Sequence, residues 1–138
     1  MLIESDILIA YIKKRDWLKP IATRIIDAIE SGKIRVQTSS EVLHELYYVF
    51  SDFASIDIIL ANEARMSSIR NLEFVEPDPA IYLTALSLMK TYELTSIFDA
   101  IYAATALSPK TTDNKIISSD GIYDKIKGIE RVDPRELV

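Results

Sequence analysis

The sequence predicts a three-layer α/β/α sandwich with a central, mostly parallel sheet. Short apolar segments that suit buried strands alternate with longer segments whose apolar residues recur at helical spacing. Such alternation requires crossover connections, which produce parallel strands covered by helices on both faces. The chain has 138 residues, of which 49% are hydrophobic, with only three glycines and five prolines. That is enough for one domain with a real core and leaves no linker, so residues 1–138 are expected to form one domain.

The first half of the chain is expected to contain two strands and three helices. An apolar strand opens LIESDILIAYI, and KIRVQ forms the second strand. The helix in WLKPIATRIIDAIESG stops at Gly32, because glycine is the usual residue after a helix. Its apolar stripe consists of Trp17, Leu18, Ile21, Ile25 and Ile29. SSEVLHELYYVFS has a second helical stripe, and a third helix runs from about Ser55 to Arg70.

The second half is expected to add three strands and two helices. LEFVE is a strand, and DPAIYLTALSLMKTYEL is a helix with Pro79 in its first turn, where proline is well tolerated. SIFDAIYAATAL forms the next helix. KIISSD and IERVD then provide the last two strands of the sheet.

Composition and charge exclude several classes of protein. The absence of cysteine excludes disulfides and thiolate metal sites and is typical of a reducing compartment. Acids stand at Glu4 and Asp6, where a signal peptide would be basic, and no apolar run approaches the roughly 18 residues of a membrane span. A soluble cytoplasmic protein is expected. The formal charge of -5 argues against a generally basic nucleic-acid-binding surface, while a local basic rim is compatible with it.

Acidic residues concentrate where the strands of the predicted sheet end. Glu4 and Asp6 lie at the end of the first strand, and Asp120 follows a later one. Asp99 opens the helix just before that strand, and Glu45 lies in the helix after the second strand. Because ligands gather at the carboxyl ends of parallel strands, these acids are expected to face one edge of the sheet.

Asp99 has a purely structural interpretation as well as a functional one. Ser96 and Asp99 fit a capping box, in which both side chains satisfy amide groups of the first helical turn. The helix that they open is apolar all round, which predicts burial on every side. A buried carboxylate is costly unless a cation compensates it, so the acid indicates more than capping.

Four other polar residues also have an interpretation from local structure. Glu41 completes a capping box that starts at Thr38, whereas Glu45 lies one turn too far into the helix for capping. Asp120 precedes a glycine and suits a turn, and Asp124 is an acid favoured at a helix start. His44, the sole histidine, is interpreted as a surface residue.

As a set, the acids predict a metal site made of oxygen ligands. Without cysteine and with a single histidine, the chain offers ligands suited to Mg²⁺ or Mn²⁺ rather than zinc. Several carboxylates in one pocket repel one another, and a divalent cation relieves that repulsion. Such a site suits phosphodiester hydrolysis by activated water.

Four segments in order make the sequence similar to the PIN-domain family, which includes the VapC toxins of prokaryotic toxin–antitoxin pairs. IESDILIAYI resembles the family's opening motif, and SSEVLHELYYVF resembles its second motif, with the acid at Glu45. SIFDAIYAATAL matches the third motif at Asp99. IISSDGIYDKIKGIERVDP resembles the closing segment, with a match at Asp120 and a weaker one at Asp124.

The resemblance implies a metal-dependent endoribonuclease that acts as the toxin of a toxin–antitoxin pair, with an antitoxin partner and a homodimeric state. Asp99, with Glu4 or Asp6, would bind Mg²⁺ or Mn²⁺, Glu45 would complete the cluster, and Asp120 would position a second ion or the attacking water. Glu4 stands where the family usually has its first aspartate, so Asp6 is the alternative ligand. Lys13, Lys14, Arg15 and Lys125 are candidates for a phosphate-binding rim.

Two other functions compete with the nuclease. A PIN-like domain that has lost activity could serve as a binding or scaffolding module, and the glutamate at position 4 favours that alternative. A receiver-like Mg²⁺-binding signalling domain is the second, but it predicts a lysine at the end of the last strand, where this chain has RVDP.

Overall fold

The computed structural model describes all 138 residues and contains one five-stranded sheet in which every pairing is parallel. The strand order is β3-β2-β1-β4-β5. The strands are β1 (Leu2–Ile3), β2 (Val36–Ser39), β3 (Leu72–Val75), β4 (Lys115–Ile117) and β5 (Glu130–Val132). The predicted α/β fold with a parallel central sheet is therefore confirmed.

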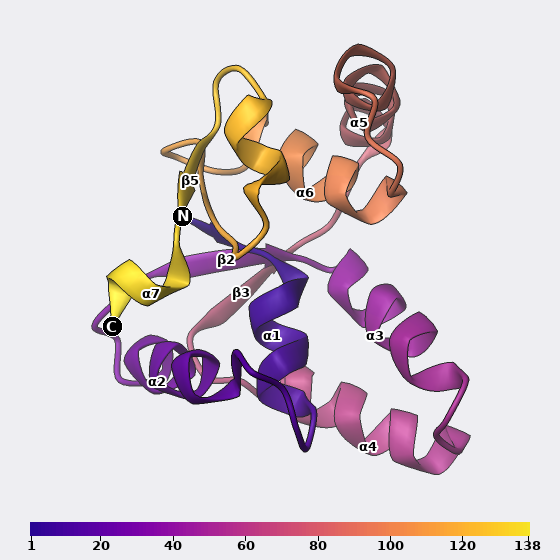
Figure 1. Ribbon diagram of the computed structural model, residues 1–138, viewed down its shortest axis with the longest axis vertical. Coiled ribbons are helices and arrows are strands. Elements are labelled where there is room, and N and C mark those ends of the chain that lie inside the picture. Colours follow the sequence, from indigo (N-terminus) through magenta and orange to yellow (C-terminus); the bar gives the residue numbers. More distant parts are fainter.

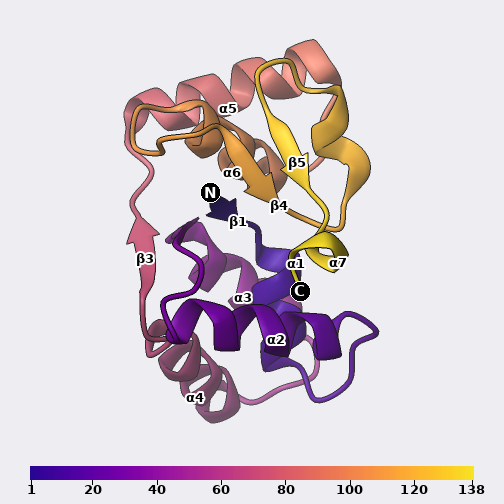
Figure 2. The ribbon, with the colours of Figure 1, turned by 90° about the vertical axis from the view of Figure 1, so that its left-hand side faces the viewer.

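Helices cover both faces of this sheet. They are α1 (Ser5–Ile12), α2 (Lys19–Glu30), α3 (Glu41–Ser51), α4 (Ile56–Ser67), α5 (Pro79–Tyr92), α6 (Ile97–Leu107), the 3₁₀ helix η1 (Gly121–Lys125) and α7 (Pro134–Leu137). Figures 1 and 2 show α5 and α6 on one side of the strands, with α1, α2 and α4 on the other. None of these helices is both long and apolar enough to span a membrane.

Neighbouring residues of the central strands supply the two halves of the core. Leu2 and Ile116 pack with α6 residues, whereas Ile3 and Ile117 pack with residues of α1 and α2. This division follows from the pleat, because successive side chains of a strand point to opposite faces. All four side chains are fully buried, which explains why the strands are apolar without alternation.

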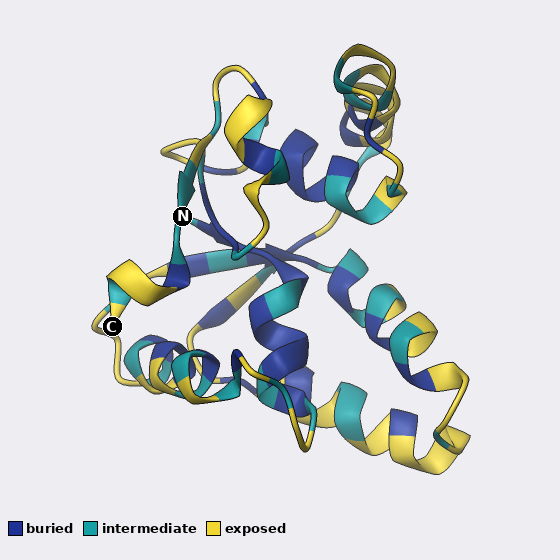
Figure 3. Ribbon diagram, in the orientation of Figure 1, coloured by how far each residue is buried: buried dark blue, intermediate teal, exposed yellow.

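The helix α6 lies close against the sheet because its side chains are small. Its inward part contains four alanines, and residues 100–106 are all buried (Figure 3). Its first turn differs: Ile97 is exposed and Asp99 is half-buried. The expectation of burial on every side is thus correct for the body of the helix and wrong for the turn that carries the carboxylate.

Several predicted boundaries were wrong. The first strand ends at Ile3, so Glu4 is the N-cap of α1 and Asp6 lies in that helix's first turn. The helix α2 begins at Lys19, which leaves Trp17 outside it and exposed. Thr38 is a residue of β2 whose hydroxyl donates to the Ile3 carbonyl oxygen, so it cannot cap α3 with Glu41.

Candidate functional site: a carboxylate-lined cavity

A cavity of about 490 Å³ opens where β1 and β4 end. Segments far apart in the sequence meet here because the carboxyl ends of parallel strands share one edge of the sheet. The acidic residues that line the cavity are Glu4, Asp6, Asp16, Glu45, Asp99 and Asp120. The structure therefore brings together all five acids predicted from the sequence and adds Asp16.

Glu4 is the most deeply placed of these acids. Its Oε1 accepts a hydrogen bond from Ser5 Oγ at 2.6 Å, and its Oε2 accepts one from Ser118 Oγ at 3.0 Å. Only 4% of the residue is exposed. Burial, with the neighbouring charge of Asp6, raises the pKa of Glu4 well above its ordinary value.

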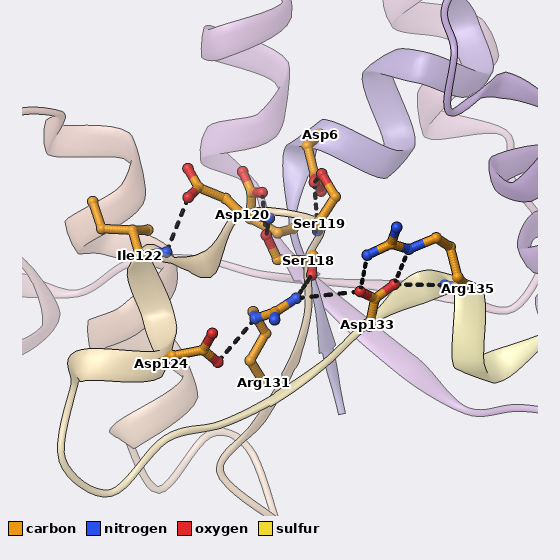
Figure 4. Close-up of polar contacts among 10 residues, drawn as sticks. Asp6, Ser118, Ser119, Asp120, Ile122, Asp124, Arg131, Asp133 and Arg135 are labelled. Carbon is orange, nitrogen blue, oxygen red and sulfur yellow. Dashed lines mark hydrogen bonds and ion pairs between the residues drawn. The ribbon is translucent and has the colours of Figure 1, made fainter.

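Asp6 connects α1 to the loop after β4. Its Oδ2 accepts hydrogen bonds from both the backbone N–H and the hydroxyl of Ser119 (Figure 4). Its Oδ1 lies 2.8 Å from the amide nitrogen of Ile7. The carboxylate is half-buried and stays in contact with the cavity.

Glu45 enters the cavity from the second turn of α3. Its Oε2 accepts a hydrogen bond of 2.9 Å from the hydroxyl of Tyr102, which comes from α6 on the other side of the site. Burial raises the pKa of Glu45, although the hydrogen bond from Tyr102 acts in the opposite direction.

Asp99 differs from the other four predicted acids because its carboxylate accepts no hydrogen bond from the protein. Its backbone N–H donates to Ser96 Oγ at 3.4 Å, so half of the predicted capping box is present. Burial raises the pKa of Asp99 to about 6, helped by the charges of Asp120, Glu45 and Asp6. A carboxylate without donors and surrounded by other carboxylates lacks a partner for its charge.

Asp120 stands exposed at the mouth of the cavity. Its Oδ1 accepts a hydrogen bond from the Ile122 N–H at 2.9 Å and thereby caps η1 (Figure 4). Its own N–H donates to Ser118 Oγ, the hydroxyl that also bonds Glu4. The turn explanation for Asp120 is therefore correct, and it is compatible with a place in the cavity.

Positive charge is scarce around these acids. None of the five predicted acids forms an ion pair, and the lysine that lines the cavity, Lys13, lies 3.9 Å from Asp16. The acids raise one another's pKa values instead, which indicates uncompensated repulsion.

The chemistry of the donors fits a hard divalent cation. All titratable acceptors lining the cavity are carboxylates, and neither histidine nor cysteine is among them. No three of them are arranged so that they could already enclose a metal ion.

Three of the four residues with an interpretation from local structure, Glu41, His44 and Asp124, lie outside the cavity. The carboxylate of Glu41 contacts His44 and accepts a hydrogen bond from the Tyr82 hydroxyl. His44 is exposed, as expected. Asp124 pairs with Arg131 at 2.9 Å rather than with the acid cluster. Of the proposed basic rim, Lys13 lines the cavity, whereas Lys125 does not.

Sequence reasoning missed the tyrosines and the tryptophan of the site. Tyr102 and Tyr123 lie behind the acids, fully buried, and the pKa of each hydroxyl is raised by burial and by neighbouring carboxylates. Trp17 lies at the rim of the cavity with 70% of its surface exposed. Its flanks, KKRD and LKP, are polar enough to have indicated a loop.

Comparison with known proteins identifies the family. The family model of the PIN domain matches residues 1–129. No curated protein sequence matches the chain. A VapBC2 complex from Rickettsia felis, bound to a DNA fragment from its promoter, has a similar structure with a TM-score of 0.71 at 15% identity, covering 95% of this chain and 96% of that one.

Two further solved structures share the fold. A toxin–antitoxin complex from Klebsiella pneumoniae has a TM-score of 0.66 at 19% identity, covering 96% of both chains. VapC20 from Mycobacterium tuberculosis, a toxin that cleaves the sarcin–ricin loop, has a TM-score of 0.68 at 16% identity, covering 87% of this chain and 89% of that one. The family match spans nearly the whole chain, and the chain belongs to the PIN domain family.

Proposed function

We propose that this protein is a metal-dependent endoribonuclease, the toxin of a toxin–antitoxin pair, and that residues 1–138 form its single nuclease domain. The observation that carries the proposal is the state of Asp99. Its carboxylate accepts no hydrogen bond from the protein and lines a cavity together with five other acids. A half-buried carboxylate without a donor or a cationic partner is typical of a functional site, and a bound metal cation would supply the missing positive charge.

The proposed roles follow from where each acid lies. Asp99 and Glu4 would hold Mg²⁺ or Mn²⁺, with Asp6 as the alternative to Glu4 and Glu45 completing the cluster. A bound divalent ion supplies positive charge that polarises the phosphate and offsets charge on the leaving oxygen. Asp120, which lies at the mouth, would orient a second ion or the attacking water. Ser118 and Ser119 hold Glu4 and Asp6 in place.

The rim of the cavity suits an RNA strand. Trp17 offers an exposed aromatic face on which a base can stack, and Lys13 lies beside it for a phosphate. Across the loop that carries both, the Lys19 ammonium donates to the carbonyl oxygens of Tyr11 and Lys13 at 2.6 Å each, which connects the start of α2 to the end of α1. Base stacking tolerates any sequence, so this contact favours single-stranded RNA without selecting a sequence.

A groove next to the cavity suits an antitoxin segment. It is lined by Phe50 of α3, Phe53 of the loop after α3 and Ile58 of α4, together with the cationic residues Lys13, Lys14 and Arg15 that follow α1. The apolar part of this groove favours the apolar face of an amphipathic peptide, and its basic edge favours acidic residues in that peptide. The antitoxins present in similar complexes support such a partner for this chain.

A second copy of the chain is proposed to cover the outer face of α5. Tyr82, Leu83 and Leu86 of this helix expose between 40% and 69% of their surface, and neighbouring exposed apolar side chains of this kind favour a protein–protein contact. Ile56, Ile58 and Leu60 of α4 are also exposed, but Ile58 lines the groove proposed for the antitoxin. A Leu86→Glu variant should therefore shift the protein from dimer to monomer in light scattering.

The nuclease proposal is tested by incubating purified protein with a panel of single-stranded RNAs. Cleavage that requires Mg²⁺ or Mn²⁺ and stops with EDTA would support it. An inactive PIN-like binding module is the competing function, favoured by glutamate at position 4 and by the open arrangement of the acids. That function would be preferred if the protein bound RNA or an antitoxin without cleaving any substrate.

A further inference from the structure

Lys19 is a cation at a helix N-terminus, where its own helix does not favour one. It is the first residue of α2, whose first turn contains no acid and whose N-cap, Leu18, makes no capping hydrogen bond with its side chain. Because the N-terminal end of a helix carries partial positive charge, a lysine there is unfavourable for that helix. The helix α2 alone therefore does not explain Lys19.

The ammonium group of Lys19 contacts the C-terminal end of α1 instead. Its Nζ donates at 2.6 Å to the carbonyl oxygens of Tyr11 and Lys13, and it lies 5.8 Å from the centroid of the Tyr11 ring. The last carbonyl groups of a helix have no partner within the helix, and α1 has no basic residue in its own last turn. Lys19 thus supplies the donors and the positive charge that this helix end favours.

The two hydrogen bonds of Lys19 close the loop of residues 13–18, which carries Trp17. On one side of Trp17, Asp16 Oδ1 accepts a hydrogen bond of 2.9 Å from the Leu18 N–H, and on the other, the Leu18 side chain is buried among core residues of α1 and α2. The indole between them is 70% exposed. The residues of this loop that line the carboxylate cavity are Lys13, Asp16, Trp17 and Leu18.

We propose that Lys19 is a positioning residue for RNA binding, because its bonds to the end of α1 hold Trp17 at the rim of the cavity, where the indole stacks on a base. This inference rests on the proposed RNA-cleaving function. Lys19 does not line the cavity itself, so it touches neither the RNA nor the acids. Its loss should weaken RNA binding and leave the chemical step unchanged.

The first test measures the affinity for a fluorescein-labelled oligouridylate by fluorescence anisotropy in EDTA, where no cleavage occurs. Lys19→Met keeps a long apolar side chain and removes the donors. It should weaken RNA binding by about tenfold, which is within the range for loss of one base–aromatic stack, and Trp17→Ala should do the same. The matched control is Lys33→Met, which changes an exposed lysine after α2 and should bind RNA as the wild type does.

The double variant that combines Lys19→Met with Trp17→Ala separates positioning from a general effect on stability. If Lys19 acts through Trp17, the double variant should bind RNA no more weakly than Trp17→Ala alone. Losses that multiply would overturn the inference, because Lys19 would then act independently of the indole. Trp17 is the sole tryptophan, so its fluorescence reports the stacking directly. RNA should quench this fluorescence in the wild type and much less in Lys19→Met.

Cleavage kinetics in Mn²⁺ show which step Lys19 affects. Lys19→Met should raise KM by about tenfold and keep kcat within about twofold, as expected when an interaction common to the ground state and the transition state is lost. A lower kcat at unchanged KM would overturn the inference. Lys19→Gln keeps one neutral donor, so it should raise KM less, and it provides the measurement if Lys19→Met does not fold.

The outcomes distinguish this inference from the nuclease proposal. Wild-type RNA affinity in both Lys19 variants would overturn the role of Lys19 and leave the nuclease function intact. RNA binding by the wild type without cleavage would refute the nuclease function alone, because the affinity measurements need no cleavage. Failure of the wild type to bind RNA, with or without Mn²⁺, would overturn both.

Discussion

Two groups of acids lie side by side at the carboxyl ends of β4 and β5, and they differ in what balances their charge (Figure 4). Near β5, Asp133 lies 2.6 Å from Arg135 and 3.8 Å from Arg131, which also pairs with Asp124. Hydrogen bonds from Arg135 hold the pKa of Asp133 well below its ordinary value. These acids are balanced within the protein.

The cavity acids are not balanced in this way. The pKa of Asp99 is raised to about 6 by burial and by other carboxylates, and burial with the charge of Asp6 raises the pKa of Glu4 well above its ordinary value. The two groups are connected, because Arg131 donates to the Ser118 carbonyl oxygen while the Ser118 hydroxyl donates to Glu4. Arg131 therefore contacts the backbone of Ser118, the partner of Glu4, but does not line the cavity. This difference is the one expected if the acids paired with Arg131 and Arg135 stabilise the fold, whereas the cavity acids bind a cation, as proposed above.

The largest expected effect comes from breaking the unbalanced group. Asp99→Asn should lower RNA cleavage by at least about a hundredfold, the scale expected when a metal ligand is lost. The matched control is Asp124→Asn, which removes the same charge from an exposed acid paired with Arg131 and should leave the rate within about twofold. Cleavage rates on one RNA substrate compare the two, and full activity in Asp99→Asn would refute the proposed mechanism.

The next comparison lies within the cavity. The variants Glu4→Gln and Asp6→Asn decide which residue after β1 serves as the metal ligand. We expect Glu4→Gln to be the more damaging of the two and to lower the cleavage rate by about a hundredfold relative to the wild type. Glu4 is held by two hydroxyls, whereas Asp6 is held by Ser119. Steady-state cleavage at several Mn²⁺ concentrations measures both. A larger loss of cleavage rate in Asp6→Asn would indicate that the metal ligand is Asp6, which is bonded to Ser119.

Breaking the balanced group should change stability and not activity. Asp133→Ala removes the N-cap of α7 and both arginine contacts, and we expect the Tm to fall by about 1–3 °C. The effect is small because α7 is a short helix next to the end of the chain. Calorimetry gives the shift. Loss of cleavage with unchanged stability would show that the two groups are not separate in function.

The last expected effect is a pH dependence. In the folded protein Asp99 has a pKa of about 6 against an ordinary value of 3.8, so the folded state binds more protons between these values. The contribution of Asp99 to stability without metal should therefore fall as the pH rises from about 4 to about 6 and then level off. Asp99→Asn should flatten this decline. An identical pH profile in the variant would mean that the carboxylate is compensated in solution.

The architecture and the acids of the site were predictable because their signals are strong. Apolar runs of strand length predicted the sheet, and apolar residues at helical spacing predicted most helices. The expectation that ligands gather at strand ends drew attention to Glu4, Asp6 and Asp120. Asp99 and Glu45 were found because neither position is explained by its helix alone. A carboxylate at an apolar position is conspicuous in a sequence, since burying it is costly.

The features that were missed depend on contacts between distant segments. Tyr102 and Tyr123 look like ordinary core residues in sequence, and their position behind the acids follows only from how α6 and η1 pack. Trp17 was assigned to a helical stripe because its spacing fits one. Lys19 instead closes a loop by binding two carbonyl groups, and that loop leaves Trp17 in solvent.

The central claim is that the cavity acids hold a divalent cation through Asp99. Its most direct test is the change in Tm that millimolar Mn²⁺ produces, because a ligand bound only by the folded state stabilises that state. We expect a rise in Tm for the wild type and for Asp133→Ala, and none for Asp99→Asn. An unchanged wild-type Tm, or an equal rise in Asp99→Asn, would contradict the account.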